Sequence, residues 1–218
     1  GLDGKTCVVS GSGHVALFAI EKLGQLGASV TACSDSEGYV VDPAGIDLDL
    51  LKEIKLDDRG RVSAYAARRQ GSSYVTGGNI WDVPCDVALP CATQNELTAS
   101  DAATLIRNGV IAVVEGANMP STPDAVASFL SAGVAFGPGK AANAGGVATS
   151  ALEMQQNASR DSWTFEHTEQ RLAQIMSGIH DACFATADEY GAPGNYVVGA
   201  NIVGFLRVSQ AMLAHGLI

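Results

Sequence analysis

The 218-residue chain has few basic residues and no run of them. It carries 13 lysines and arginines against 23 aspartates and glutamates, which gives a formal net charge of −10 and a sequence pI of about 4.7. Binding to nucleic acid or to an anionic membrane surface depends on clustered cations that neutralise phosphates. The charge balance therefore argues against nucleic-acid and membrane partners, whereas local backbone N–H groups can still bind an anionic cofactor.

Cysteine and histidine spacings typical of disulfide frameworks or metal sites are absent. The five cysteines are odd in number, contain no C-x-x-C pair, and are Cys7, Cys33, Cys85, Cys91 and Cys183. The four histidines are scattered along the chain. We expect small buried thiols in a reducing, cytoplasmic compartment and no metal site.

Long apolar runs are absent as well. No stretch reaches the roughly 18 uninterrupted apolar residues of a transmembrane helix, and no signal peptide is visible. The chain begins with Gly1 rather than methionine. We therefore expect a processed or excised piece of a longer protein that has no membrane partner.

The most specific pattern that is present lies in the first 35 residues. An apolar run over 6–9 precedes Gly11-Ser12-Gly13-His14-Val15-Ala16, which opens a helical pattern, and Asp35 ends a second apolar stretch 22 positions after Gly13. The order strand, glycine turn, helix, strand, acid is the fingerprint of a dinucleotide-binding unit. Gly11 permits the tight turn, and Gly13 lets the backbone approach a pyrophosphate. The helix N-terminus is expected to face the phosphates.

Further apolar runs alternate with helical patterns up to Gly146. Strands are expected over 39–41, 86–90, 110–114 and 134–136. Helices are expected over 48–54, within an arginine-rich stretch at 57–70, from a cap at Ser100-Asp101 to Arg107, and from Ser121-Thr122-Pro123 to Gly133. The alternation predicts an α/β fold: a Rossmann-like, doubly wound, mostly parallel sheet with helices on both faces.

The strand patterns stop after Gly146, and helices are expected over 147–160, 164–190 and 197–216. There is no internal repeat, low-complexity tract or linker. We therefore expect a single dinucleotide-binding domain over 1–218. Residues 1–146 would form the sheet and its crossover helices, and residues 147–218 a C-terminal helical layer.

Five polar loops follow predicted strands, at 11–14, 35–38, 90–96, 115–120 and 137–146. In an open α/β sheet, ligands bind beyond the carboxyl ends of the strands. Short amide and hydroxyl side chains beside glycines suit recognition of ribose hydroxyls and a carboxamide. Asn95 and Ser100 fit a helix-capping role equally well, so both readings stay open for them.

These loops resemble the cofactor-binding domain of the hexameric, NADP(H)-using glutamate dehydrogenases of bacterial type. The resemblance covers about residues 4–218 and rests on Gly11-Ser12-Gly13-x-Val15-Ala16, Ser34-Asp35-Ser36, the segments 89–97 and 115–120, the long run 136–157, and Gly199-Ala200-Asn201-Ile202. The run Gly137-Pro138-Gly139-Lys140-Ala141-Ala142-Asn143-Ala144-Gly145-Gly146, continued to Ser150, is its most specific part.

The resemblance implies roles for individual positions. Cofactor-binding residues would be Ser10, Gly11, Ser12, Gly13, His14 and Val15 at the pyrophosphate turn, Asp35 and Ser36 at the adenosine ribose and its 2′-phosphate, Ala92, Thr93 and Gln94 along the groove, and Asn118 and Asn143 at the nicotinamide end. Ser150 would reach the side-chain carboxylate of glutamate. In the full enzyme, a homohexamer, a hydride passes between L-glutamate and the nicotinamide, and the product is hydrolysed to 2-oxoglutarate and ammonia.

The resemblance also implies what this chain does not supply. The family's catalytic lysine and aspartate, and the lysines that bind the substrate carboxylates, belong to an N-terminal substrate domain that is missing here. The chain has five lysines, and the resemblance gives Lys140 no catalytic role. We therefore expect no catalytic residue in this chain, and an isolated polypeptide that binds cofactor without turning over glutamate.

Two positions depart from simple rules. Position 14 is histidine where the family usually has asparagine, which puts one cofactor hydrogen bond in doubt. An acid at position 35 ordinarily indicates NAD(H), since it bonds the ribose diol and repels a 2′-phosphate. The family pattern Ser34-Asp35-Ser36 favours NADP(H) instead, with NAD(H) as the alternative. Arg68 or Arg69 would then be the phosphate partner.

Two other functions fit the sequence. The chain could be a free-standing dinucleotide-binding module with no redox partner. It could also be the cofactor domain of a dehydrogenase acting on leucine, valine or phenylalanine, which would need an apolar side-chain pocket. Serine at position 150 favours a carboxylate substrate over these alternatives.

Overall fold

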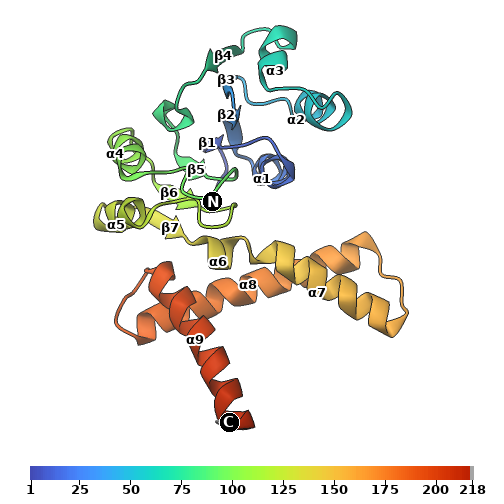
Figure 1. Ribbon diagram of the computed structural model, residues 1–218, viewed down its shortest axis with the longest axis vertical. Coiled ribbons are helices and arrows are strands. Elements are labelled where there is room, and N and C mark those ends of the chain that lie inside the picture. Colours follow the sequence, from blue (N-terminus) through green and yellow to red (C-terminus); the bar gives the residue numbers. More distant parts are fainter. Residues whose placement is uncertain (217–218) are drawn as a thin grey trace. The chain divides into compact units, whose positions relative to one another are not determined.

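The computed structural model describes residues 1–216, which divide into two compact units on either side of the Phe136–Gly137 bond. The first unit holds the sheet and its helices, and the second is helical (Figure 1). Residues 137–146, which we expected to belong to the sheet and its crossover helices, lie in the second unit. The predicted domain ended at position 218, and residues 217 and 218 lie outside the described residues. A single domain over the whole chain stays a prediction.

A seven-stranded sheet in the order β4-β3-β2-β1-β5-β6-β7 forms the centre of the first unit. Its strands are β1 (Thr6–Val9), β2 (Ser29–Asp35), β3 (Gly38–Val41), β4 (Ser73–Thr76), β5 (Val87–Leu89), β6 (Ala112–Val114) and β7 (Ala135–Gly137). The pairs β2–β1, β1–β5 and β5–β6 are parallel, whereas β3 pairs antiparallel with both β2 and β4. The predicted mostly parallel, Rossmann-like sheet is confirmed, and β4 is a strand that the sequence did not predict.

The central strands are apolar because helices cover both of their faces. Cys7, Val8 and Val9 of β1 have no exposed surface. Figure 1 shows α1, α2 and α3 on one side of the sheet and α4 and α5 on the other. The helices of this unit are α1 (His14–Gln25), α2 (Leu48–Lys52), α3 (Ser63–Arg68), α4 (Ala99–Arg107) and α5 (Pro123–Ser131), with a π-helical turn at Glu53–Asp57 and a 3-10 turn at Ile80–Asp82.

The sequence predicted the N-terminal cap of α5 correctly and that of α4 incorrectly. Thr122 caps α5 by accepting a bond from the Ala125 N–H at 3.4 Å, with proline in the first turn as predicted. The predicted cap of α4 at Ser100-Asp101 is wrong by two residues. Thr98 is the N-cap, and its N–H and hydroxyl both donate to Asp101 Oδ2 at 2.7 Å. Asp101 therefore acts as the third residue of a capping box rather than as the cap.

The segment between β3 and β4 is less regular than the predicted helix over 48–54. Asp47 caps α2 by accepting from the Leu50 N–H at 3.1 Å, and after Lys52 the chain continues as the π-helical turn. Arg59 then adopts a φ of +52°, which stops any helix before α3 begins. The arginine-rich stretch therefore forms a short helix that starts only at Ser63.

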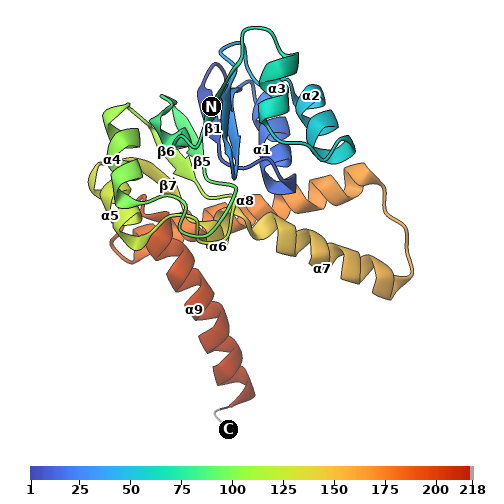
Figure 2. The same cartoon turned by 45° about the horizontal axis from the view of Figure 1, so that its top comes forward.

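The second unit consists of α6 (Gly139–Ala142), α7 (Ala144–Ser159), α8 (Phe165–Glu189) and α9 (Tyr196–His215), which confirms the predicted run of helices. Within it α7 packs along α8, and the first half of α9 crosses α8 (Figure 2). The crossing is close, because a Cβ on Gly199 would lie 2.0 Å from the carbonyl oxygen of Cys183. Only glycine fits at this point of the interface.

The second half of α9 keeps several large apolar side chains exposed, among them Val208 (61%) and Leu213 (76%). Within residues 1–216, α9 is the one helix whose length and composition would allow it to cross a membrane. Its apolar surface is interrupted by Asn201, Arg207 and Gln210. By these criteria alone the helix fits a protein interface as well as it fits a lipid environment.

Candidate functional site

The glycine turn connects β1 to α1 and is shaped by Gly11, a position that favours glycine. Gly11 has a φ of +81°, and a Cβ there would lie 3.1 Å from the Ala92 Cβ and 3.3 Å from the Cys91 carbonyl oxygen. The N–H of Gly11 donates to the Ser34 hydroxyl at 2.8 Å, which fixes the turn against the end of β2. Ser10 and Ser12 are buried, whereas Gly13 is exposed.

The N-terminus of α1 is open. Gly13 is the N-cap and supplies no side-chain hydrogen bond, and no acidic residue lies in the first turn. His14 and Val15 begin the helix with exposed side chains, while Ala16 is fully buried against the sheet. The positive end of the helix dipole and its first N–H groups therefore face solvent at the carboxyl edge of the sheet, where an anion would be stabilised.

Asp35 ends β2, and both of its carboxylate oxygens are used within the protein. Oδ1 accepts from the Glu37 N–H at 2.9 Å, and Oδ2 accepts from the Val62 N–H at 2.9 Å. The second bond joins the end of β2 to the segment that begins α3. Asp35 thus organises the loop in addition to lying at the site predicted for the ribose.

Ser36 is exposed and accepts a hydrogen bond from Arg61 Nη1 at 2.9 Å. The same guanidinium lies 3.2 Å, through Nε, from Glu37 Oε1. The Lys55 ammonium donates to the Gly60 carbonyl, one residue before Arg61, at 2.8 Å. Ser36 is therefore a hydroxyl bonded to a guanidinium that also pairs with a carboxylate.

The arginines expected beside Ser36 lie elsewhere, which corrects the sequence prediction. Arg68 pairs with Glu53 at 2.7 Å and with Asp58 at 3.2 Å. Arg69 bonds Asp42, whose side chain is 1% exposed, at 3.1 Å. Both guanidinium groups are engaged in carboxylate pairs, and these pairs raise their pKa. The arginine that the sequence analysis missed is Arg61, two residues before α3.

Ala92, Thr93 and Gln94 follow β5 and are exposed along the same edge of the sheet. The N–H groups of Ala92 and Thr93 donate to Glu96 Oε1 at 3.0 and 3.3 Å, so the loop folds back on its own carboxylate. Glu96 was not among the predicted site residues.

The loop that carries Asn118 is tied to this segment. The N–H groups of Gly116 and Ala117 both donate to the Pro90 carbonyl at 3.0 Å, and a Cβ on Gly116 would lie 2.5 Å from the Cys91 sulfur. Asn118 is exposed, and the Met119 carbonyl accepts from the Asn95 N–H at 3.0 Å. The loops after β5 and β6 therefore form one connected surface.

Asn143 and Ser150 lie in the second unit. Asn143 separates α6 from α7, and its N–H donates to the Gly139 carbonyl at 2.9 Å. Ser150 is exposed on α7, and its hydroxyl donates to the Gly146 carbonyl of the preceding turn at 3.3 Å. Lys140 donates to the Asn201 side chain, which joins α6 to α9. The roles of Asn143 and Ser150 stay predictions.

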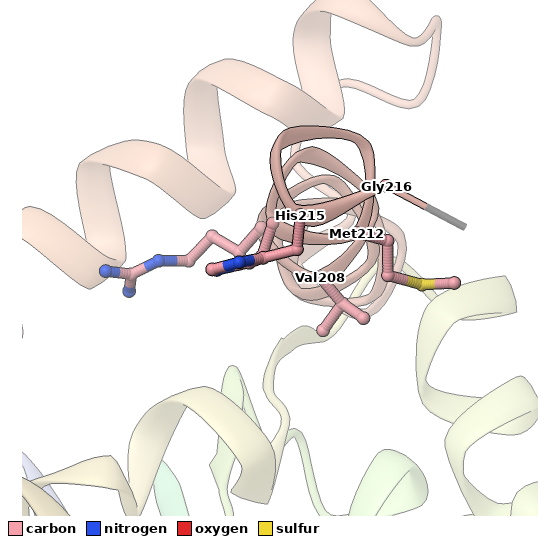
Figure 3. A pocket seen from close by; sticks show the side chains of 6 residues that line it. Val208, Met212, His215 and Gly216 are labelled. Carbon is pink, nitrogen blue, oxygen red and sulfur yellow. The ribbon is translucent and has the colours of Figure 1, made fainter. Parts of the chain in front are cut away.

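The depression at the end of α9 does not resemble a ligand site, and the described residues offer no metal site. A shallow depression at the end of α9 is lined only by that helix, and its labelled side chains spread outward rather than converge (Figure 3). No group of three or more histidine, cysteine, aspartate or glutamate side chains within residues 1–216 could hold a metal ion. The polar groups that converge lie at the carboxyl ends of β1, β2, β5 and β6.

Comparisons with known proteins agree over the whole chain. The sequence profile of the Glutamate/Leucine/Phenylalanine/Valine dehydrogenase family matches residues 1–216. The NADP-specific glutamate dehydrogenase of Salmonella typhimurium is 55% identical over 224 residues, which cover 100% of this chain and 49% of that protein. The glutamate dehydrogenase of Bacteroides thetaiotaomicron is 51% identical over 220 residues, again 100% of this chain and 49% of that protein.

The fold comparison gives the same result. The structure of glutamate dehydrogenase from Plasmodium falciparum matches with a TM-score of 0.95 at 43% identity, over 98% of this chain and 47% of that one. The chain thus spans about half the length of the curated relatives it matches.

Proposed function

The chain belongs to the glutamate, leucine, phenylalanine and valine dehydrogenase family, and we propose that it is the NADP(H)-binding part of a glutamate dehydrogenase. The observation that carries the proposal is the open N-terminus of α1 beside the Arg61–Ser36 pair, at the carboxyl edge of the sheet. Relatives named as NADP-specific glutamate dehydrogenases, matched over the full chain, support both the substrate and the cofactor.

The turn at Gly11 fits a pyrophosphate. Its backbone approaches the loop after β5 so closely that a side chain has no room, and α1 offers uncapped N–H groups next to it. A diphosphate placed there would be held by Ser12, Gly13, His14 and Val15 through backbone donors and the helix dipole. The exposed imidazole of His14 can add a ring N–H donor.

The end of β2 fits a phosphorylated ribose. Each oxygen of the Asp35 carboxylate already accepts one backbone N–H, and these two donors partly offset the negative charge that a 2′-phosphate would meet. Ser36 and Arg61 instead supply a hydroxyl and a guanidinium, groups that suit a 2′-phosphate. These contacts favour NADP(H) over NAD(H).

The remaining predicted residues would hold the rest of the reactants. Ala92, Thr93 and Gln94 line the edge between the glycine turn and the Asn118 loop, where the adenosine and nicotinamide halves of a dinucleotide would meet. Asn118 and Asn143 would orient the nicotinamide, which accepts or donates the hydride when bound. Ser150 would bind the side-chain carboxylate of glutamate, whereas leucine, valine or phenylalanine would need an apolar group there.

The full activity requires partners beyond these residues. We propose a substrate domain elsewhere in the whole protein, assembly as a homohexamer, and a cytoplasmic location, where the five buried thiols would stay reduced. The interconversion of L-glutamate with 2-oxoglutarate and ammonia belongs to that assembly. The 218-residue chain on its own is expected to bind cofactor and to show no turnover.

A paired titration of the purified chain with NADPH and NADH, followed by reduced-nicotinamide fluorescence, tests the proposal. Tighter binding of NADPH is the expected result. Tighter binding of NADH would refute the assignment of the Asp35–Ser36 loop to a 2′-phosphate. Failure to bind either dinucleotide would refute the cofactor-binding function itself.

A further inference from the structure

The Glu96 carboxylate lies where three parts of the candidate cofactor site meet. One of its oxygens, Oε1, accepts the Ser10 hydroxyl at 2.9 Å, the Ala92 N–H at 3.0 Å and the Thr93 N–H at 3.3 Å. Ser10 directly precedes the glycine turn, and the other two donors belong to the loop after β5. A single acceptor atom therefore joins segments that are more than 80 residues apart in the sequence.

The Ser10 hydroxyl relays this link. It donates to Glu96 and at the same time accepts from the Cys91 N–H at 2.8 Å. The Ser10 N–H donates to the Leu89 carbonyl at 3.0 Å, which extends the pairing of β1 with β5 up to the turn. Ser10 is 1% exposed, so water does not compete for these bonds.

The linked segments form the wall against which a dinucleotide would lie. The position of a Cβ on Gly11 is 3.1 Å from the Ala92 Cβ, so any shift of Ala92 changes the space above the glycine turn. Without Glu96, two N–H groups of the loop and the Ser10 hydroxyl would lose their common acceptor. The loop would then be free to adopt other conformations.

We propose that Glu96 is a positioning residue of the cofactor site, which sets the shape of the groove by holding Ser10, Ala92 and Thr93 on one oxygen atom. The inference rests on the proposed dinucleotide-binding function. It assigns to Glu96 no contact with the cofactor, and it makes the acceptor geometry of the side chain, rather than its negative charge, the property that matters.

The electrostatics of the position support this reading. Burial raises the pKa of the Glu96 carboxyl group despite the three donors that favour its ionised form. The titratable group that faces it is the Cys91 thiol, whose own pKa burial raises to about 12, so that thiol stays protonated near neutral pH. Burial thus penalises a negative charge at this position, and a neutral acceptor of the same shape should serve as well.

Three substitutions separate geometry from charge. Glu96→Gln keeps an oxygen at the same reach and removes the charge, whereas Glu96→Asp keeps the charge on a shorter side chain. Glu96→Met removes the acceptor. Asp86→Asn is the matched control, because the Asp86 carboxylate accepts the N–H and hydroxyl of Thr6 at 2.8 and 3.0 Å at the opposite end of β1.

The NADPH titration should give the following order. Glu96→Gln and Asp86→Asn should bind within about twofold to threefold of wild type, whereas Glu96→Asp and Glu96→Met should bind about tenfold or more weakly, as expected when several hydrogen bonds are lost. Unchanged affinity in Glu96→Met, or equal losses in Glu96→Gln and Glu96→Asp, would overturn the inference. The Asp variant decides the matter if the Met variant does not fold.

A readout without cofactor accompanies the titration. In ¹H–¹⁵N spectra of the free chain, the amide signals of Ala92 and Thr93 should stay near their wild-type positions in Glu96→Gln and should move or broaden in Glu96→Asp. Unmoved signals in Glu96→Asp would contradict the idea that Glu96 holds Ala92 and Thr93 in place. A wild-type chain that binds neither dinucleotide refutes the proposed function, and the cofactor role of Glu96 with it. If the wild-type chain binds NADPH and the Glu96 variants bind it with unchanged affinity, the Glu96 inference alone is refuted.

Discussion

Replacing Arg61 by methionine should separate the two nicotinamide cofactors. The guanidinium donates to the Ser36 hydroxyl at 2.9 Å and lies 3.2 Å from Glu37 Oε1, and its side chain is 51% exposed. A 2′-phosphate bound at Ser36 would come within hydrogen-bonding reach of the same group. NADH has no phosphate at that position, so the substitution should leave its affinity within about twofold of wild type.

The size of the effect follows from the exposure of the pair. A charge-assisted hydrogen bond contributes about 1.5–3 kcal/mol, and half-exposure favours the lower part of this range because solvent screens the charges. A loss of about 1.5–2 kcal/mol corresponds to roughly 10-fold to 30-fold weaker NADPH binding. The effect should shrink as salt is added, since the Debye length is only about 8 Å at physiological ionic strength.

Two companion variants complete the experiment: one should raise NADPH affinity, and the other is a control. Glu37→Gln removes the carboxylate that competes with a phosphate for Arg61, so NADPH affinity should rise while NADH affinity stays the same. Arg68→Met removes a similar charge that is already paired with Glu53 and Asp58, and it should change neither affinity. Fluorescence titrations at two salt concentrations measure all four proteins. Equal losses for NADPH and NADH in Arg61→Met, or an Arg68→Met variant that behaves like it, would refute the reasoning.

Four further outcomes follow from the structure. Gly199→Ala should destabilise the helical unit by about 1–3 kcal/mol in thermal denaturation, because its Cβ would meet the Cys183 carbonyl oxygen at 2.0 Å, whereas Gly204→Ala, with no atom within 4 Å, should cost nothing. Hydrogen bonds from Thr6 lower the pKa of the Asp86 carboxyl group below its usual 3.8. The stability that they provide is therefore present above that value and is lost as pH falls through the lower folded pKa. In urea unfolding, Asp86→Asn should make the free energy of unfolding fall less steeply over this acid range. Burial raises the pKa of all five thiols, so Ellman's reagent at pH 8 should react with them rapidly only after the chain is unfolded. The chain mixed with glutamate, or with 2-oxoglutarate and ammonia, and either cofactor should give no dose-dependent rate of nicotinamide oxidation or reduction.

The sequence was sufficient for those parts of the fold that depend on local patterns. The glycine turn, the apolar strands around it and the helices of the second half each have their signal within about 15 consecutive residues. Gly11 was predicted to form a tight turn, and its φ of +81° and the contact with Ala92 give the reason that no other residue fits. The alternation also predicted a mostly parallel sheet, and β1 pairs parallel with both β2 and β5.

Contacts between distant segments were beyond the reach of pattern reasoning. Strand β4 has one half-buried and three exposed residues, so it lacks a hydrophobic alternation and is identified only by its pairing with β3. Arg61 meets Ser36 across 25 residues, and Glu96 meets Ser10 across 86. Glu96 lies in the polar loop 90–96, but nothing local distinguishes its side chain from its neighbours. Arg59-Gly60-Arg61 shortly before a helix is the local signal for Arg61, and Arg68 and Arg69 give an equally strong one.

Asp35 shows why the usual rule for the end of the second strand needs the structure. An acid at this position selects NAD(H) when its carboxylate is free to bond a ribose diol. Here each carboxylate oxygen accepts one backbone N–H at 2.9 Å, from Glu37 and from Val62, and the Val62 bond holds the segment that carries Arg61 next to Ser36. The negative charge is thereby partly neutralised by donors, and the same residue that would repel a 2′-phosphate positions the guanidinium that would bind it. Whether Asp35 favours NAD(H) or NADP(H) therefore depends on what its oxygens bond, rather than on the presence of an acid in the sequence.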